Sequence, residues 1–347
     1  MRLIYGGGIR ANAAAEDLRA RATLLNYRTA ALTLASDISL TWVRLIDAQN
    51  QINILNTQLE TNGKVLKVLR GRFGVGQVRS ADILRQRLLM ESVREEKILA
   101  ETRLRTLEHQ LAVLKGMPPQ SAKFKPPQAL PDLPAQPETG LPAELVQRRP
   151  DIQSIYYSIK AADKDVAVAL SNRYPRLTLS ASYISDAASP ENLFSSWMTT
   201  FAAALIGPVF DGGERRSEVN RTQARRAELI NTYKQTTLDA FQEVENALIR
   251  EQKQAERIQN LRLRLDLAEK TYQQLQTGYF NGASDYIDTL TALSEKQQIE
   301  RDLLDARRLL VEYRINLYRA LAGGFETPRE SISENAMPPL QEPARDT

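Results

Sequence analysis

Cysteine is absent from the 347-residue sequence, and histidine occurs once, at position 109. Without cysteine the chain has no disulfide, no thiolate nucleophile and no cysteine-ligated metal. His109 stands in a charged stretch with no second metal ligand four residues later, which favours a surface position on a helix. Gly6, Gly7 and Gly8 lack the spacing and the lysine of a phosphate-binding loop. We therefore expect a protein that is not an enzyme and that has no cofactor or metal site of its own.

Long apolar runs are also missing. No run of 18 apolar residues occurs, so no segment is predicted to span a membrane as a helix. The segment 1–5 is too short, and too soon interrupted by glycine, to be a signal peptide. The net charge is only +4, because 46 cations and 42 acids share the same segments. This balance favours solvated helix faces, and we expect no nucleic acid among the partners.

The sequence contains one pattern twice, at a separation of about 206 residues. Tyr27 corresponds to Tyr233, and Gly76 corresponds to Gly282. The two copies can be aligned over about 100 residues with two single-residue shifts in register. A duplication of this length predicts two copies of one structural unit.

Each copy is predicted to be an antiparallel pair of long helices. Proline and glycine are absent from 10–62 and from 215–277. A helix of about 53 residues would be about 80 Å long, which points to coiled-coil packing. The apolar positions alternate in steps of three and four, as a coiled-coil seam requires. In the first copy these positions are Ile52, Leu55, Leu59, Leu66, Leu69 and Phe73, with the polar Asn62 among them.

Glycines occur where the chain must reverse direction between the two helices of each pair. The two predicted tips are 71–77 and 278–284. Glycine allows the positive φ that a chain reversal after a helix needs. An antiparallel coiled coil explains these turns by itself. Their near-identity suggests in addition that both tips meet the same environment.

The two copies are separated by a proline-rich connector and two strand candidates. Segment 117–142 holds eight of the sixteen prolines and is expected to be extended. A helix should follow, with Pro150 in its first turn. Residues 176–183 then alternate strictly between apolar and polar, and residues 197–210 do so loosely. This pattern fits either a hairpin packed on a helix or two strands of a membrane barrel.

This order of segments resembles the TolC-like outer-membrane factors of the outer-membrane efflux protein family, in particular the drug-efflux (NodT-type) branch. The resemblance covers about residues 3 to 324. Its most specific parts are the segment Leu141–Ile152 (LPAELVQRRPDI), the segment Gly207–Gly213 (GPVFDGG) and the tip pattern with Gly282, Asp288 and Leu290.

The resemblance implies a mainly α fold, with two long antiparallel helical hairpins as a tunnel wall and a short β-hairpin in an outer-membrane barrel. It implies a homotrimer in the outer membrane of a Gram-negative bacterium, in contact with its lipid and with a large periplasmic part. Drugs or other small molecules would pass through it. Its partners would be a periplasmic adaptor protein and an inner-membrane transporter such as an RND pump.

The resemblance also assigns roles to single residues. Asp82, Tyr279 and Asp288 match aperture positions, and Ser284 stands where the best-known member has an aperture arginine. Three Asp288 carboxylates would favour cations and bind a multivalent metal ion. For both aspartates, capping of a helix start is the alternative. Further roles are adaptor docking (Gly74, Gly76, Arg79, Gly282), the strand-to-helix crossing (Gly207, Pro208, Gly212, Gly213) and the barrel's aromatic girdle (Tyr183, Trp197).

One departure from the family concerns the start of the chain. A member should have a signal peptide, a helix and two strands before the first hairpin, so about a hundred residues are expected to be missing. A barrel without those strands would have open edges in lipid, where unpaired backbone groups are costly. A lipid anchor, common in this branch, would also lie there. Two alternatives to a channel therefore stay open: a soluble periplasmic coiled-coil scaffold or adaptor, and a truncated, non-functional channel fragment.

The expected segments are 1–9 (remnant of a strand or of the crossing), 10–116 (first hairpin), 117–142 (connector), 143–174 (short helix), 175–210 (two strands), 211–324 (second hairpin) and 325–347 (flexible tail).

Overall fold

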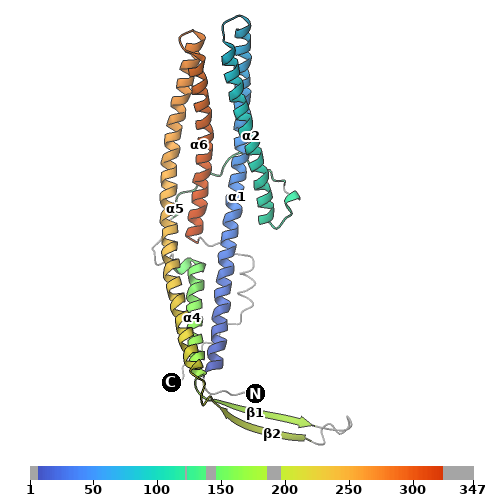
Figure 1. Ribbon diagram of the computed structural model, residues 1–347, viewed down its shortest axis with the longest axis vertical. Coiled ribbons are helices and arrows are strands. Elements are labelled where there is room, and N and C mark those ends of the chain that lie inside the picture. Colours follow the sequence, from blue (N-terminus) through green and yellow to red (C-terminus); the bar gives the residue numbers. More distant parts are fainter. Residues whose placement is uncertain (1–6, 122, 138–145, 186–196, 323–347) are drawn as a thin grey trace.

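The computed structural model describes residues 7–121, 123–137, 146–185 and 197–322. The remnant expected at 1–9 (up to residue 6), residues 186–196 between the two expected strands, and the tail expected at 325–347 lie outside these residues. Four long helices dominate the described part (Figure 1). They are α1 (Gly8–Gly74), α2 (Ser80–Leu114), α5 (Glu214–Phe280) and α6 (Tyr286–Ala320).

The helices confirm the duplicated hairpin. Hairpin 1 consists of α1 and α2, and hairpin 2 of α5 and α6. The first helix of each has 67 residues and the second has 35. A helix of 67 residues is about 100 Å long, so the predicted length of about 80 Å was too short. In α1 the helix continues through Gly63 and Gly71. A helical glycine costs only about 1 kcal/mol, which the packing along a whole hairpin outweighs.

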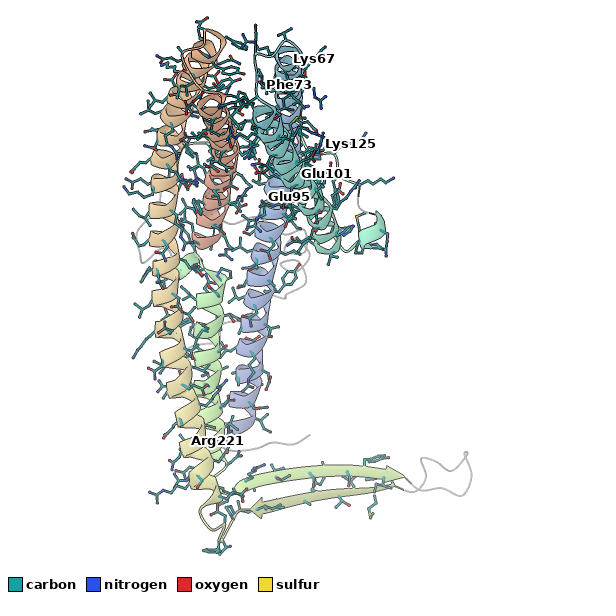
Figure 2. All side chains as sticks on the ribbon, turned by 45° about the horizontal axis from the view of Figure 1, so that its top comes forward. Lys67, Phe73, Glu95, Glu101, Lys125 and Arg221 are labelled. Carbon is teal, nitrogen blue, oxygen red and sulfur yellow. The ribbon has the colours of Figure 1, made fainter. Side chains whose placement is uncertain are left out.

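Apolar seams hold each hairpin together. In hairpin 1, Leu45 and Leu111 belong to one buried cluster, and Leu261 and Ile299 belong to another in hairpin 2. The side chain of Phe73, the last position predicted for the first seam, is half exposed. It lies in the final turn of α1, close to the tip (Figure 2), where few residues remain to cover it.

The two tips have the same turn geometry. Gly76 and Gly282 have φ values of 75° and 78°. In hairpin 1, the Gln77 amide donates to the Arg72 carbonyl at 2.9 Å, and the Gly76 amide donates to the Phe73 carbonyl at 2.9 Å. Hairpin 2 repeats both bonds. This is the Schellman ending of a helix, and its left-handed position explains the glycine in each copy.

Helix α4 (Pro150–Ser171) lies between α1 and α5 at the end far from the tips (Figure 1). Pro150 is in its first turn, as predicted. The described part of the connector contains one 3₁₀ turn, η1 (Pro119–Ser121), and is otherwise without helix or strand. It contacts both hairpins: Asn50 Nδ2 donates to the Gln128 carbonyl at 2.8 Å, and Arg314 Nη1 donates to the Pro134 carbonyl at 2.7 Å.

Strands β1 (Arg176–Ser185) and β2 (Trp197–Ile206) form an antiparallel pair that projects sideways beyond α4 (Figure 1). The second strand is shorter than the predicted 197–210. Pro208 has no N–H to donate, and a Cβ on Gly207 would lie 2.9 Å from the Pro175 ring, so the ladder ends there.

Most of the described side chains of the strands are exposed, including all of those on β2. Leu205 is 72% and Phe201 81% exposed, and Tyr183 stacks on Trp197 with ring centres 5.9 Å apart. The alternative in which the apolar face of the strands packs on a helix is therefore wrong for the described residues.

Candidate functional site at the hairpin tips

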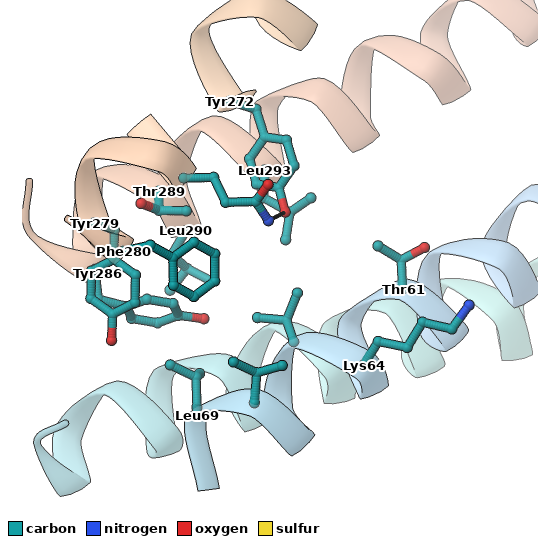
Figure 3. Close-up of a pocket in the computed structure, with 13 residues that line it drawn as sticks. Thr61, Lys64, Leu69, Tyr272, Tyr279, Phe280, Tyr286, Thr289, Leu290 and Leu293 are labelled. Carbon is teal, nitrogen blue, oxygen red and sulfur yellow. Dashed lines mark hydrogen bonds between the residues drawn. The ribbon is translucent and has the colours of Figure 1, made fainter. Parts of the chain in front are cut away.

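The tips of the two hairpins enclose an apolar cleft. Its volume is about 260 Å³. One wall is α1, with Thr61, Lys64 and Leu69, and the other wall is the end of hairpin 2 (Figure 3). The aromatic residues of hairpin 2 at this cleft are Tyr272, Tyr279, Phe280 and Tyr286.

Tyr279, a predicted aperture residue, belongs to this aromatic group. Its ring centre lies 5.4 Å from that of Tyr286, and both pack in one cluster with Leu69 of α1. Arg72 of the first tip lies over both aromatic rings at the end of α5, 5.6 Å from the ring centre of Tyr279 and 4.8 Å from that of Phe280. The tips therefore contact each other through aromatic packing and one guanidinium group.

The two predicted aperture aspartates have different surroundings. The Asp82 side chain is buried, with the Arg79 Nε 3.5 Å and the Arg85 Nη1 3.3 Å from its carboxylate oxygens. Asp288 is exposed on α6. Both lie in the first turn of their helices, where a negative charge is favourable. The capping alternative is wrong, because the N-cap positions are Arg79 and Asp285 and neither helix start has a side-chain capping bond.

The residues predicted for adaptor docking surround the turns. Gly74 ends α1, Gly76 and Gly282 are the left-handed turn positions, and Arg79 is 68% exposed in its side chain. Arg79 also lies 3.8 Å from Asp285 of the second tip. Ser284 lies against Gly278, where an added Cβ would be 2.5 Å from the serine hydroxyl.

A buried hydrogen-bond chain near the tips was not predicted. The Tyr286 hydroxyl donates to Gln86 Oε1 at 2.6 Å, and Gln86 Nε2 donates to the Asn62 carbonyl at 3.0 Å. The side-chain amides of Asn62 and Gln297 bond each other at 3.2 Å. Burial raises the pKa of the Tyr286 phenol, so it stays a donor. The one available signal was Asn62 at an otherwise apolar seam position.

The strand-to-helix crossing repeats a feature of the first copy. Gly212 and Gly213 have φ values of 60° and 90°, and Gly7 before α1 has 69°. The Asp211 carboxylate accepts a bond from the Gly213 amide at 3.0 Å. Phe210 beside it is 92% exposed. Among the described residues, Val209 and Phe210 therefore form an exposed apolar surface at the crossing.

The RRPD part of the motif around Pro150 joins three helices. Arg149 donates from Nη2 to Asp151 at 2.6 Å and from Nη1 to Glu243 of α5 at 2.8 Å and to the Ala320 carbonyl at the end of α6 at 3.1 Å. These contacts explain why an arginine stands here, because its planar fork serves several acceptors.

Among the described residues, no helix combines the length and apolar character needed to cross a bilayer. Within the same ranges, no three histidine or carboxylate side chains are grouped so that they could hold a metal ion.

Comparisons with known proteins place the chain in a family. Residues 141–323, more than half of the sequence, match the outer membrane efflux protein family. The pyoverdine export outer membrane protein OpmQ of Pseudomonas aeruginosa is 29% identical over 324 residues, which are 90% of this chain and 66% of that protein. Nodulation protein T of Rhizobium leguminosarum bv. viciae is 25% identical over 88% of this chain and 64% of its own length. The chain thus spans about two thirds of the length of these curated relatives.

Solved structures have the same fold. The outer membrane protein VceC from Vibrio cholerae superimposes with a TM-score of 0.85 at 23% identity, over 93% of this chain and 77% of that one. The CmeC outer membrane channel of Campylobacter jejuni gives 0.85 at 20% identity, over 96% and 73%. The fold and the family match agree with the resemblance of the motifs. The chain belongs to the outer membrane efflux protein family.

Proposed function

We propose that this chain is a subunit of a homotrimeric channel in the outer membrane of a Gram-negative bacterium. The channel is the passive exit duct of a tripartite efflux system for drugs or other small molecules. A periplasmic adaptor and an inner-membrane transporter such as an RND pump complete the system. The subunit catalyses no reaction.

One observation carries this proposal: a two-stranded sheet with exposed apolar side chains projects from the far end of two long helical hairpins (Figure 1). Ten-residue strands with Tyr183 and Trp197 stacked at one end have the length and aromatic placement of strands that cross an outer membrane. In the channel, β1 and β2 pair with strands of other segments in a shared barrel, and the tips point into the periplasm.

The tips supply the aperture. Tyr279 and the buried Asp82 belong to the packed part of the tips, whereas the exposed Asp288 is free to face the lumen. Three Asp288 carboxylates around one axis select cations and bind a multivalent cation. Apolar side chains exposed on α2, such as Leu84 and Leu88, are available for neighbouring subunits.

Conductance in a planar bilayer tests the proposal. The protein is expressed with any coding sequence that continues in frame before Met1, and is purified from the membrane fraction. We expect trimers with cation-selective conductance that trivalent cations block. The Asp288→Asn variant should lose both the selectivity and the block, whereas Asp266→Asn on the surface of α5 should keep them. Recovery from the soluble fraction as a monomer without conductance would instead support a periplasmic scaffold.

A further inference from the structure

The contacts between the hairpins change in kind along their length. Near the tips, Leu69 of α1 packs with Tyr286 of α6 in an apolar cluster, as apolar residues do inside each hairpin. Farther from the tips, hydrogen bonds and ion pairs join α1 to α6, from Arg44 with Glu312 to Asn62 with Gln297. Polar groups can exchange a protein partner for water at little net cost, whereas apolar groups cannot. The polar part of the boundary between α1 and α6 can therefore separate at less cost than an apolar seam inside a hairpin.

A cluster of five charged residues occupies the middle of this boundary. Arg44 and Asp47 belong to α1, and Asp305, Arg308 and Glu312 belong to α6. Arg44 donates to both carboxylate oxygens of Glu312, at 2.9 Å and 3.1 Å. Arg308 Nε lies 3.2 Å from Asp47 Oδ2, and Arg308 also pairs with Asp305 and Glu312 on its own helix. The pairs Arg44–Glu312 and Asp47–Arg308 therefore each join one residue of hairpin 1 to one residue of hairpin 2.

Asp47 is the least satisfied member of this cluster. Its exposed fraction is 0%, and neither of its carboxylate oxygens has a hydrogen bond of good geometry among the described residues. Burial therefore raises the pKa of Asp47 to about 6, although the charge of Arg308 opposes the shift. The more distant Asp305 raises this pKa further, whereas Arg103 on α2 and the side chain of Gln51 on α1 lower it.

We propose that this cluster is a proton-responsive latch, in which uptake of a proton by Asp47 strengthens the packing of α1 on α6. When the hairpins separate, water reaches Asp47 and its pKa returns to its ordinary value near 3.8. The packed state then binds a proton more tightly than the separated state. Acidification from about pH 7.5 to about pH 5 should raise the ratio of packed to separated chains about tenfold.

The distance between the hairpins measures this ratio. The chain has no native cysteine, so spin labels attach only to cysteines introduced at the exposed Asn56 on α1 and Gln259 on α5. Pulsed electron resonance on the complete chain in detergent gives the distance distribution at both pH values. We expect the longer-distance population to shrink on acidification.

Three variants make the test specific. Asp47→Asn imitates the neutral carboxyl group and should show the acid distribution at both pH values. The control Asp266→Asn, on the exposed surface of α5, should keep the response of the original chain. Arg308→Gln removes the cation that lowers the pKa of Asp47, and should move the midpoint to higher pH. This variant still tests the latch if Asp47→Asn does not fold.

A distance distribution that is the same at both pH values, or a response that persists in Asp47→Asn, would overturn the latch. The measurement does not depend on conductance, so the latch and the proposed channel can fail independently.

Discussion

The guanidinium group of Arg72, in the first tip, lies 4.8 Å from the ring centre of Phe280, in the second. The same residue donates to the Phe280 carbonyl at 3.5 Å. A cation over an aromatic ring at an exposed site contributes about 0.5–1 kcal/mol. Arg72 is thus a direct link between the two tips within one chain.

Arg72→Ala should therefore loosen the tips. In a reconstituted channel we expect a larger mean conductance, because the ends of the hairpins separate more often. Arg70→Ala removes an exposed arginine one residue before the tip segment and serves as the control. If both variants change the conductance equally, the effect comes from net charge and not from the contact with Phe280.

Gly63 and Gly76 should respond to alanine with opposite signs. A Cβ at either position meets no atom within 4 Å, so steric contact does not distinguish them. Gly63 is inside α1, where alanine favours the helix by about 1 kcal/mol. Gly76 has a φ of 75°, where alanine is strained by about 1 kcal/mol. Thermal unfolding should show a higher Tm for Gly63→Ala and a lower Tm for Gly76→Ala. Equal shifts would contradict this account of the turn.

The sequence predicted the turns at the two tips, with Gly76 and Gly282, because local sequence rules determine where such turns form. A glycine that follows a long stretch of regularly spaced apolar residues indicates the end of a helix, whichever element the helix packs against. The same holds for Pro150 at a helix start. The helix ends were less predictable, since Gly71 looks like part of the turn and lies within α1. The packing of the whole hairpin keeps Gly71 in the helix, and the local sequence gives no sign of this packing.

The candidate site was predicted only in part, because its contacts join distant segments. Asn62 was recognisable in the sequence as a polar residue at an apolar position of the seam. The spacing of the apolar residues does not indicate that Gln297 is its partner. Nor does the pattern show that Asp82 would be buried between Arg79 and Arg85 while Asp288 stays exposed. Such differences depend on how one hairpin lies against the other.

Arg149→Lys should destabilise the junction of α4, α5 and α6. A lysine ammonium group cannot donate to Asp151, Glu243 and the Ala320 carbonyl at the same time, because it lacks the planar guanidinium group with its several N–H donors. Because the carboxylates of Asp151 and Glu243 are partly exposed to water, the lost hydrogen bonds should cost about 1 kcal/mol. We expect chemical denaturation to begin at a lower denaturant concentration. Arg216→Lys, on the exposed surface of α5, should leave the midpoint unchanged, and similar shifts in both variants would contradict a specific role for Arg149.

The pH dependence of unfolding should carry the signature of Asp47. Its pKa is about 6 in the folded chain, above its ordinary value of 3.8, so the folded state binds the proton more tightly. A raised carboxyl pKa means that stability increases as the pH falls through 6, and that this gain is complete only below the ordinary pKa of 3.8. From about pH 7.5 to about pH 5 the contribution is about 1 kcal/mol, which corresponds to a change of about tenfold in the folding equilibrium.

The contribution is isolated by the difference between the original chain and Asp47→Asn, measured by chemical denaturation at both pH values. Other carboxylates titrate in both proteins and cancel in this difference. We expect Asp47→Asn to be the more stable protein at about pH 7.5, because its amide is neutral in the same buried position. Its advantage should shrink by about 1 kcal/mol at about pH 5. A difference that does not change with pH would show that Asp47 stays ionised throughout, with Arg308 compensating its burial in full.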